Sequence, residues 1–229
     1  MILALDTATR VISLAVHRGD RLLAERTWRT ENVHTVELAP QVALLLDQAH
    51  CAPADLIAVA VCIGPGSYTG VRIGLAYAKG LGLALGLPLI GVSTFDASLS
   101  VAPIEARTAA VLVPAGRSRH ILARFVRDAN DAALWRPDGE PIVCDGARLT
   151  QELLAAQPAA VVGEWEGLPE TLLQALSGRP VWIAPTHLAV RRAGALAELA
   201  WARRRDAAAA SSASEIAPLY IGTVAGSAA

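Results

Sequence analysis

The chain has 229 residues, of which 53% are hydrophobic and 18% are charged. This composition suits one sizeable core or two small ones, and it excludes a disordered chain. The 20 basic and 21 acidic side chains leave a formal charge of -1. No global field would hold a polyanion, which argues against a stand-alone nucleic-acid-binding protein.

The cysteines and the apolar segments indicate the cellular location of the protein. Cys51, Cys62 and Cys144 are odd in number and widely spaced, which predicts neither a disulfide framework nor a thiolate metal site. The amino terminus lacks the basic flank and long apolar run of a signal peptide. Residues 73–90 are strongly apolar, but Lys79 near their middle makes a membrane helix costly. We therefore expect a cytoplasmic location.

The first third of the chain predicts a sheet covered by helices. Alternating, β-branched segments predict strands at 2–6, 11–17 and 21–28, joined as an antiparallel meander. Apolar spacing then predicts an amphipathic helix, with Asn32 as its cap and Pro40 in its early turns or at a bend. The later elements of this part are expected as helix 33–49, strand 56–63, helix 68–85 and strand 87–92. The order β-β-β-α-β-α-β indicates a mixed sheet.

Beyond Ser93 the segments are shorter, which predicts a second, smaller α/β unit. Its short strand candidates are 109–113, 121–126, 160–162 and 181–183. An Ala- and Arg-rich helix is expected at 188–205, followed by a flexible joint over 207–214. The expected domains are therefore 1–100, which helix 188–205 could complete, and 101–221, with a frayed tail over 222–229.

The most informative segment is the glycine-rich run over residues 64–74, GPGSYTGVRIG. It follows a predicted strand and opens a predicted helix, where free N–H groups can hold an anion. A P-loop is excluded because Val71 and Arg72 follow Gly70 where Lys and Ser/Thr are required. The spacing also fails the Rossmann pattern and the nucleophile elbow. Ser67 is then either a helix cap or an anion contact.

Small residues recur at every fourth position along this helix: glycine at 66, 70, 74, 82 and 86, and alanine at 78. Such a row lies along one helix face. Each glycine inside a helix costs about 1 kcal/mol relative to alanine. A close approach of another backbone would offset this cost, and that backbone could belong to the same chain or to a partner.

The segments Ile2–Thr7, Gly64–Gly74 and Ala78–Leu81 resemble the TsaB (YeaZ) family of bacterial tRNA threonylcarbamoyladenosine biosynthesis proteins, and the likeness covers most of the chain. The resemblance implies an α/β, actin-like and sugar-kinase-like (ribonuclease H-like) fold of two related domains with mixed sheets. It also implies a non-catalytic scaffold subunit without catalytic residues. Such a subunit binds and activates TsaD, which transfers a threonylcarbamoyl group to the adenosine next to the anticodon of tRNA.

The resemblance further implies the partners. These are TsaD, the TsaE ATPase in a larger complex, a second copy of the chain when it is alone, and tRNA only indirectly. The alternative is an active enzyme of the same fold, either an ATPase or kinase or a peptidase-like enzyme. A direct tRNA contact through Arg117, Arg119, Arg124 and Arg127 is disfavoured, because their spacing alternates between strand faces.

In the family the pair of subunits joins mainly through the first two helices. Those helices carry the expected interface residues of this chain: Val36, Leu38, Val42, Leu45, Gly70, Arg72, Gly74, Ala78, Lys79 and Gly82. A vestigial nucleotide or anion contact is expected at Asp6, Thr7, Gly66 and Ser67.

Neither a cofactor nor a metal is expected to belong to this chain. Ala8 stands where the nucleotide-binding superfamily usually has glycine, so ATP or ADP is expected to bind weakly, not at all, or at the subunit boundary. The histidines never come closer than sixteen residues, which excludes a local helical pair of metal ligands.

Overall fold

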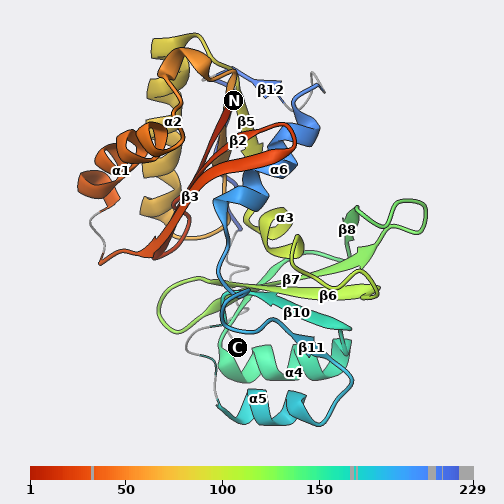
Figure 1. Cartoon of the computed structure of the whole chain (residues 1–229). Coiled ribbons are helices and arrows are strands. Elements are labelled where there is room, and N and C mark those ends of the chain that lie inside the picture. Colours follow the sequence, from red (N-terminus) through yellow and green to blue (C-terminus); the bar gives the residue numbers. More distant parts are fainter. Residues whose placement is uncertain (32–33, 166–167, 169, 206–209, 213, 222–229) are drawn as a thin grey trace. The chain divides into compact units, whose positions relative to one another are not determined.

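The structure is a computed structural model that describes residues 1–31, 34–165, 168, 170–205, 210–212 and 214–221. The chain divides into two compact units (Figure 1). Unit 1 consists of residues 1–97 and 191–219, and unit 2 of residues 98–190 together with 220 and 221. Each unit is built around its own mixed sheet.

The sheet of unit 1 has the strand order β12-β5-β4-β1-β2-β3. Its strands are β1 (Ile2–Asp6), β2 (Val11–Arg18), β3 (Arg21–Arg29), β4 (Ala58–Cys62), β5 (Leu89–Val92) and β12 (Ala210–Ser211). β1 pairs antiparallel with β2 and parallel with β4. The predicted meander is confirmed, with one register shift at Val16 and His17.

Helices cover both faces of this sheet (Figure 1). The helices along this part of the chain are α1 (His34–Gln48), the short 3-10 helix η1 (Pro53–Asp55), α2 (Tyr68–Leu85), α3 (Thr94–Leu99) and α6 (Ala193–Arg203). α1 and α2 lie on one face and α6 on the other. The predicted helices 33–49 and 68–85 are confirmed, and Pro40 is accommodated inside α1. The predicted cap Asn32 lies outside the described residues.

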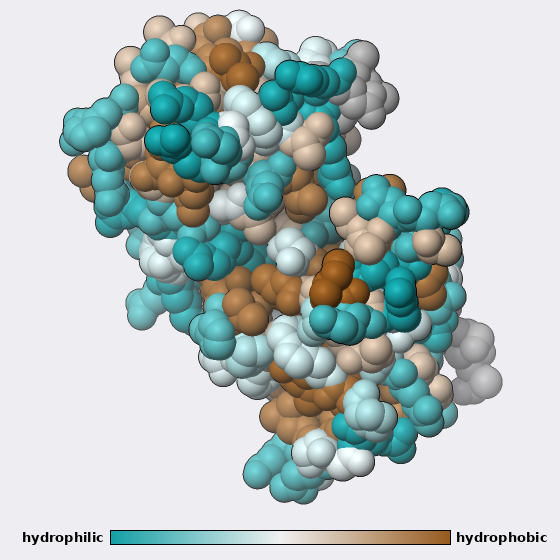
Figure 2. Space-filling model, turned by 45° about the vertical axis from the view of Figure 1, so that its right-hand side comes forward, coloured by the Kyte–Doolittle hydropathy of each residue, from teal (hydrophilic) through white to brown (hydrophobic). Residues whose placement is uncertain are grey.

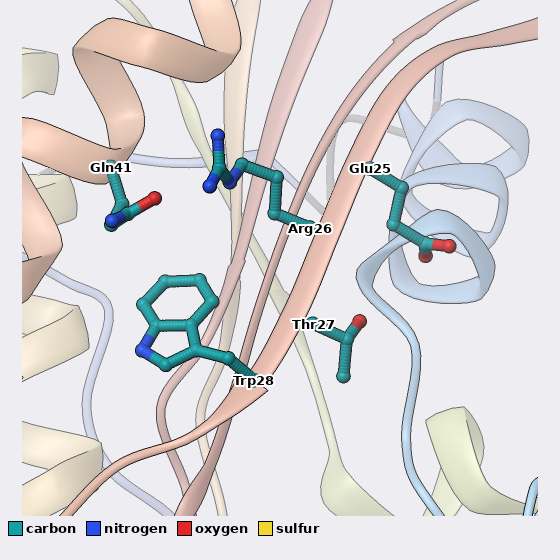
Figure 3. A pocket seen from close by; sticks show the side chains of 5 residues that line it. All are labelled: Glu25, Arg26, Thr27, Trp28 and Gln41. Atoms are coloured by element: carbon teal, nitrogen blue, oxygen red, sulfur yellow. The ribbon is translucent and has the colours of Figure 1, made fainter.

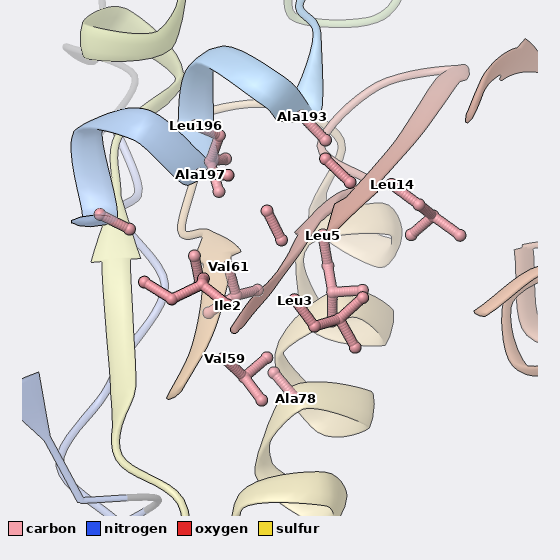
Figure 4. Close-up of a cluster of buried hydrophobic side chains, with 14 of the residues drawn as sticks. Ile2, Leu3, Leu5, Leu14, Val59, Val61, Ala78, Ala193, Leu196 and Ala197 are labelled. Carbon is pink, nitrogen blue, oxygen red and sulfur yellow. The ribbon is translucent and has the colours of Figure 1, made fainter. Parts of the chain in front are cut away.

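The core of unit 1 forms because β1 and β4 are apolar on both faces. All five residues of each strand are buried. Figure 4 shows Leu3 and Leu5 toward α2, and Leu196 and Ala197 entering from α6. A strand that is buried on both faces needs no alternation of apolar and polar residues. Residues 58–62 are accordingly all apolar, and β1 does not alternate as expected, since residues 2–5 are all apolar and buried.

The structure corrects two predictions near the carboxyl end of the chain. The predicted helix 188–205 begins only at Ala193, because the residues before it run as a loop that turns Arg191 into the interior. The backbone N–H of Ala193 donates to Ser13 Oγ at 2.8 Å, which fixes this start. The predicted joint over 207–214 contains β12, which pairs with β5. Residues 206–209, 213 and the predicted tail 222–229 lie outside the described residues.

Unit 2 has a sheet of order β11-β10-β6-β7-β8, with β9 paired to β7. Its elements are β6 (Thr108–Pro114), β7 (His120–Arg127), β8 (Trp135–Pro137), β9 (Ile142–Cys144), α4 (Gly146–Ala156), β10 (Ala160–Gly163), α5 (Glu170–Ser177) and β11 (Trp182–Ile183). The four predicted strands are confirmed. Leucines of α4 and α5 form the core against this sheet.

The surface is mixed in character. Figure 2 shows one face on which apolar patches lie among hydrophilic side chains, with neither kind dominating. None of the helices in the described part of the chain combines the length and the apolarity needed to cross a bilayer.

Candidate functional site

The turn between β1 and β2 is the centre of the site that the sequence indicated. Asp6 ends β1, and its carboxylate accepts a hydrogen bond from the Ala8 N–H at 2.9 Å. The Thr7 hydroxyl donates to the Gly70 carbonyl in α2 at 2.7 Å. The turn is therefore tied both to itself and to the first turn of α2.

A buried ion pair closes this turn. The Arg191 Nε lies 2.8 Å from Asp6 Oδ2, and both side chains are 2% exposed. Arg191 Nη2 also donates to Asp6 Oδ1 at 3.4 Å and to Thr9 Oγ1 at 3.2 Å. A carboxylate held by a guanidinium is already neutralised inside the protein. The carboxylate of Asp6 consequently has an internal counter-ion.

The glycine row of α2 packs against the same turn. A Cβ added at Gly66 or Gly70 would lie closer than 3.0 Å to the backbone carbonyl of Ala8 or Thr7. At Gly74 it would meet the Thr7 hydroxyl equally closely. The backbone that approaches the row thus belongs to the same chain. Of the two interpretations, internal packing accounts for these three glycines.

The amino terminus of α2 is capped by a side chain of the same chain. Ser67 Oγ accepts from the Gly70 N–H at 3.2 Å, which makes Ser67 the helix cap. The Ser67 N–H donates to the Ala8 carbonyl at 2.6 Å. The four residues expected as a vestigial nucleotide contact are therefore brought together, but Asp6, Thr7 and Ser67 bond internally and Gly66 packs on Ala8.

Most of the expected interface residues are buried in the core of unit 1, where they pack against the chain's own sheet. The buried ones are Leu38, Val42, Leu45, Gly70, Gly74, Ala78 and Gly82. The physical reason is that three- and four-residue spacing marks the helix face with the strongest burial, and here that face covers the chain's own sheet. Val36 and Arg72 are exposed, and Lys79 is half-buried.

A different set of apolar side chains is exposed on α1 and α2: Val36, Leu44, Tyr68, Leu83 and Leu85. Val36 is 72% exposed and Leu83 76%. The guanidinium of Arg72 lies 3.8 Å from the centre of the Tyr68 ring. Leu44 and Leu83 were not among the interface residues expected from the sequence. The available signal was that both stand outside the periodic series that faces the sheet.

Arg127, one of the four arginines considered for a tRNA contact, is engaged inside unit 2. Arg127 Nε donates to the Ala106 carbonyl at 2.8 Å, and its Nη2 donates to Pro103 at 2.7 Å. The guanidinium also lies 4.1 Å from the Trp135 ring centre. Arg127 therefore fastens a loop of unit 2. Among the described residues no three acidic, His or Cys side chains gather as metal ligands.

Comparison with known proteins identifies the family. The family model for TsaD, tRNA N6-adenosine threonylcarbamoyltransferase, matches residues 28–137. The chain is 32% identical over 175 residues to the Escherichia coli (strain K12) tRNA threonylcarbamoyladenosine biosynthesis protein TsaB, covering 72% of this chain and 68% of that protein. It is 41% identical over 95 residues to the Bacillus subtilis (strain 168) protein of the same name. That match spans 42% of each chain, so less than half of that relative.

A solved structure agrees along nearly the whole chain. A Pseudomonas aeruginosa protein described as similar to the peptidase YEAZ superimposes with a TM-score of 0.74 and 27% identity, covering 96% of this chain and 99% of that one. Two mixed-sheet α/β units of this kind define the actin-like, ribonuclease H-like class of proteins. Within that class, the chain belongs to the TsaB (YeaZ) family.

Proposed function

We propose that this chain acts in tRNA threonylcarbamoyladenosine biosynthesis as a non-catalytic subunit. It docks a TsaD-type catalytic subunit through the exposed apolar side chains of α1 and α2. The names of its relatives support the pathway. The match to the TsaD family model supports a partner of related fold, because a chain that matches this model shares its fold with a TsaD-type subunit.

One observation supports the proposed docking surface. Two adjacent helices expose large apolar side chains, including Val36 and Leu44 on α1 and Tyr68 and Leu83 on α2. Burying such residues against a partner removes apolar surface from water, which favours association. Arg72, stacked on Tyr68, adds a residue type enriched at interfaces. In this proposal the exposed helix faces replace the buried glycine row as the contact.

The ion pair between Asp6 and Arg191 supports the non-catalytic part of the proposal. A metal-bound nucleotide at the β1–β2 turn would need a carboxylate that is free to bind it. In this chain Arg191 already occupies the Asp6 carboxylate. A nucleotide, if one takes part, is then held at the boundary with the partner, and turnover belongs to the partner.

Co-purification with a TsaD-type subunit tests the docking surface. Leu83→Asp and Val36→Asp place a charge on the proposed contact and should abolish the complex while each variant still folds. Leu22→Asp is the matched control, because Leu22 is an exposed leucine (45%) on β3 rather than on these helices. Unchanged binding by both helix variants contradicts the proposal. Gly74→Leu is unsuitable, because it would disrupt the fold itself.

Two further measurements separate the proposal from its alternatives. Light scattering should give a homodimer for the isolated chain, because without TsaD the same apolar face is free to pair with a second copy. Leu83→Asp should give a monomer, because the new charge opposes that contact. Calorimetry with ATP and Mg²⁺ should show no turnover by the isolated chain. Measurable hydrolysis would favour the ATPase or kinase alternative instead.

A further inference from the structure

A pocket of about 500 Å³ lies beside β3, the edge strand of unit 1. It is lined by Glu25, Arg26, Thr27, Trp28 and Gln41. Figure 3 shows Arg26 and Trp28 projecting from β3 to the side of α1, where Gln41 faces them. Glu25 and Thr27 project to the opposite side of the strand. The size falls within the range of small-molecule sites, about 300–1,000 Å³.

Two polar groups of this pocket lack partners within the described residues. Gln41 Oε1 is buried and accepts no hydrogen bond. Arg26 is half-buried, and in the part of the chain that the structure describes its guanidinium has neither an acidic nor a hydrogen-bonding partner. A buried acceptor without a donor costs about 1–3 kcal/mol. The buried Gln41 acceptor requires an explanation, and a bound ligand is one, whereas the half-buried Arg26 guanidinium is available to pair with an anion.

The charges around the pocket favour an anion at Arg26. The carboxylate of Glu25 is used on the other side of the strand, where it accepts from the Gly194 N–H at 2.7 Å and pairs with Arg192. Thr27 is likewise used there, with its hydroxyl 2.7 Å from Ser13 Oγ. One other carboxylate is near. Glu37 Oε2 accepts from the Trp28 Nε1 at 3.2 Å and so fixes the indole ring.

We infer that this pocket binds a small aromatic carboxylate that carries a hydroxyl or amino group. The carboxylate pairs with the Arg26 guanidinium, whose planar fork matches it. The hydroxyl or amino hydrogen satisfies Gln41 Oε1, and the aromatic ring lies against Trp28. The Glu37 carboxylate repels the ligand's carboxylate and therefore lowers the affinity of the site. The inference does not rest on the docking face, because Val36, Leu44, Tyr68 and Leu83 do not line this pocket.

The probe is 4-hydroxybenzoate, titrated into the full chain and followed by NMR or calorimetry. Saturable one-site binding is expected. Arg26→Met, which keeps the apolar stem, should weaken it about tenfold or more, as should replacement of the probe by neutral 4-hydroxybenzamide. Gln41→Leu should remove the preference for 4-hydroxybenzoate over benzoate. Glu37→Gln should strengthen binding. Arg21→Met on the same strand, paired with Asp20 in solvent, is the matched control.

The inference is overturned if the titration does not saturate, if the amide binds as well as the acid, or if Arg26→Met leaves the affinity unchanged. Melting temperatures of all variants within a degree or so of each other would exclude unfolding as the cause of lost binding. If Arg26→Met still forms the complex with TsaD, a loss of ligand binding in this variant tests the pocket alone and not the docking surface.

Discussion

At the scale of single residues, the buried ion pair between Asp6 and Arg191 joins two distant parts of the chain. Its partners lie 185 positions apart in sequence, yet both are nearly inaccessible to solvent. A charge buried in this way is tolerated only while its partner is present. The pair therefore holds the β1–β2 turn and the loop before α6 in one place.

Breaking this pair should be costly. We expect Asp6→Asn and Arg191→Met each to lower the free energy of unfolding by about 3–5 kcal/mol, because each leaves one buried charge uncompensated. The double variant should cost clearly less than the sum of the two. Urea unfolding followed by circular dichroism measures all three.

The control for this prediction is Arg203→Met. Arg203 pairs with Asp96 at 2.9 Å, but their side chains are 37% and 35% exposed. An ion pair in contact with water contributes about 0–1 kcal/mol. If Arg191→Met and Arg203→Met lowered the free energy of unfolding by similar amounts, the buried pair would contribute no more to stability than the exposed one.

His17 makes stability depend on pH. Burial lowers its pKa, against the opposing charge of Glu198, and its ring lies 5.7 Å from that of Trp201. The folded state thus resists a proton that the unfolded state takes up near its ordinary pKa of about 6.5. Stability should fall as the pH drops below that value. His17→Phe should flatten the dependence between pH 7.5 and 5.5 in thermal unfolding, and an unchanged slope would contradict the prediction.

At the scale of elements, α2 contains two kinds of glycine. Gly74 has the Thr7 hydroxyl where a side chain would be, whereas Gly80 has nothing within 4 Å of an added Cβ. We expect Gly74→Ala to destabilise the protein through steric overlap. Gly80→Ala should stabilise it by up to about 1 kcal/mol, the ordinary helix preference for alanine.

Thermal unfolding of these two single-methyl variants compares both glycines within one helix. The overlap at Gly74 should shrink in a Thr7→Ala background, where the clashing hydroxyl is absent. Equal effects of the two alanines would refute the internal role of the glycine row.

At the scale of the whole molecule, the charge balance predicts weak contact with tRNA. The 20 basic and 21 acidic side chains nearly cancel. Several arginines also form hydrogen bonds or ion pairs within the chain, among them Arg127, Arg191 and Arg203. Because phosphate binding depends on free cations, the isolated chain should show no saturable tRNA binding at 0.15 M salt. Tight binding in a gel-shift assay would contradict this and would favour direct recognition.

The pattern of strands and helices could be predicted where periodicity is strong. The meander of β1, β2 and β3 and the bounds of α2 follow from alternation and from the Ser67 cap. The start of α6 was predicted five residues too early, because the Ala- and Arg-rich run from 188 continues a helical composition. Only contacts with Ser13 and Glu25 set its true start.

The candidate site could be predicted only in part. The glycine spacing predicted that another backbone comes close to α2, and this holds at Gly70, whereas Gly80 has nothing near it. Which backbone approaches was decided by the fold, which places Thr7 and Ala8 against the row.

Local sequence thus determined most of the elements and the family likeness, and it offered Ser67 as a helix cap, since each of these depends on neighbours within a few residues. The tertiary structure alone decided that Arg191 neutralises Asp6, that Arg26 and Gln41 share a pocket, and that Leu83 rather than Gly74 faces solvent. Each of these depends on which distant segments meet, and on the burial that results, so no local pattern contains it.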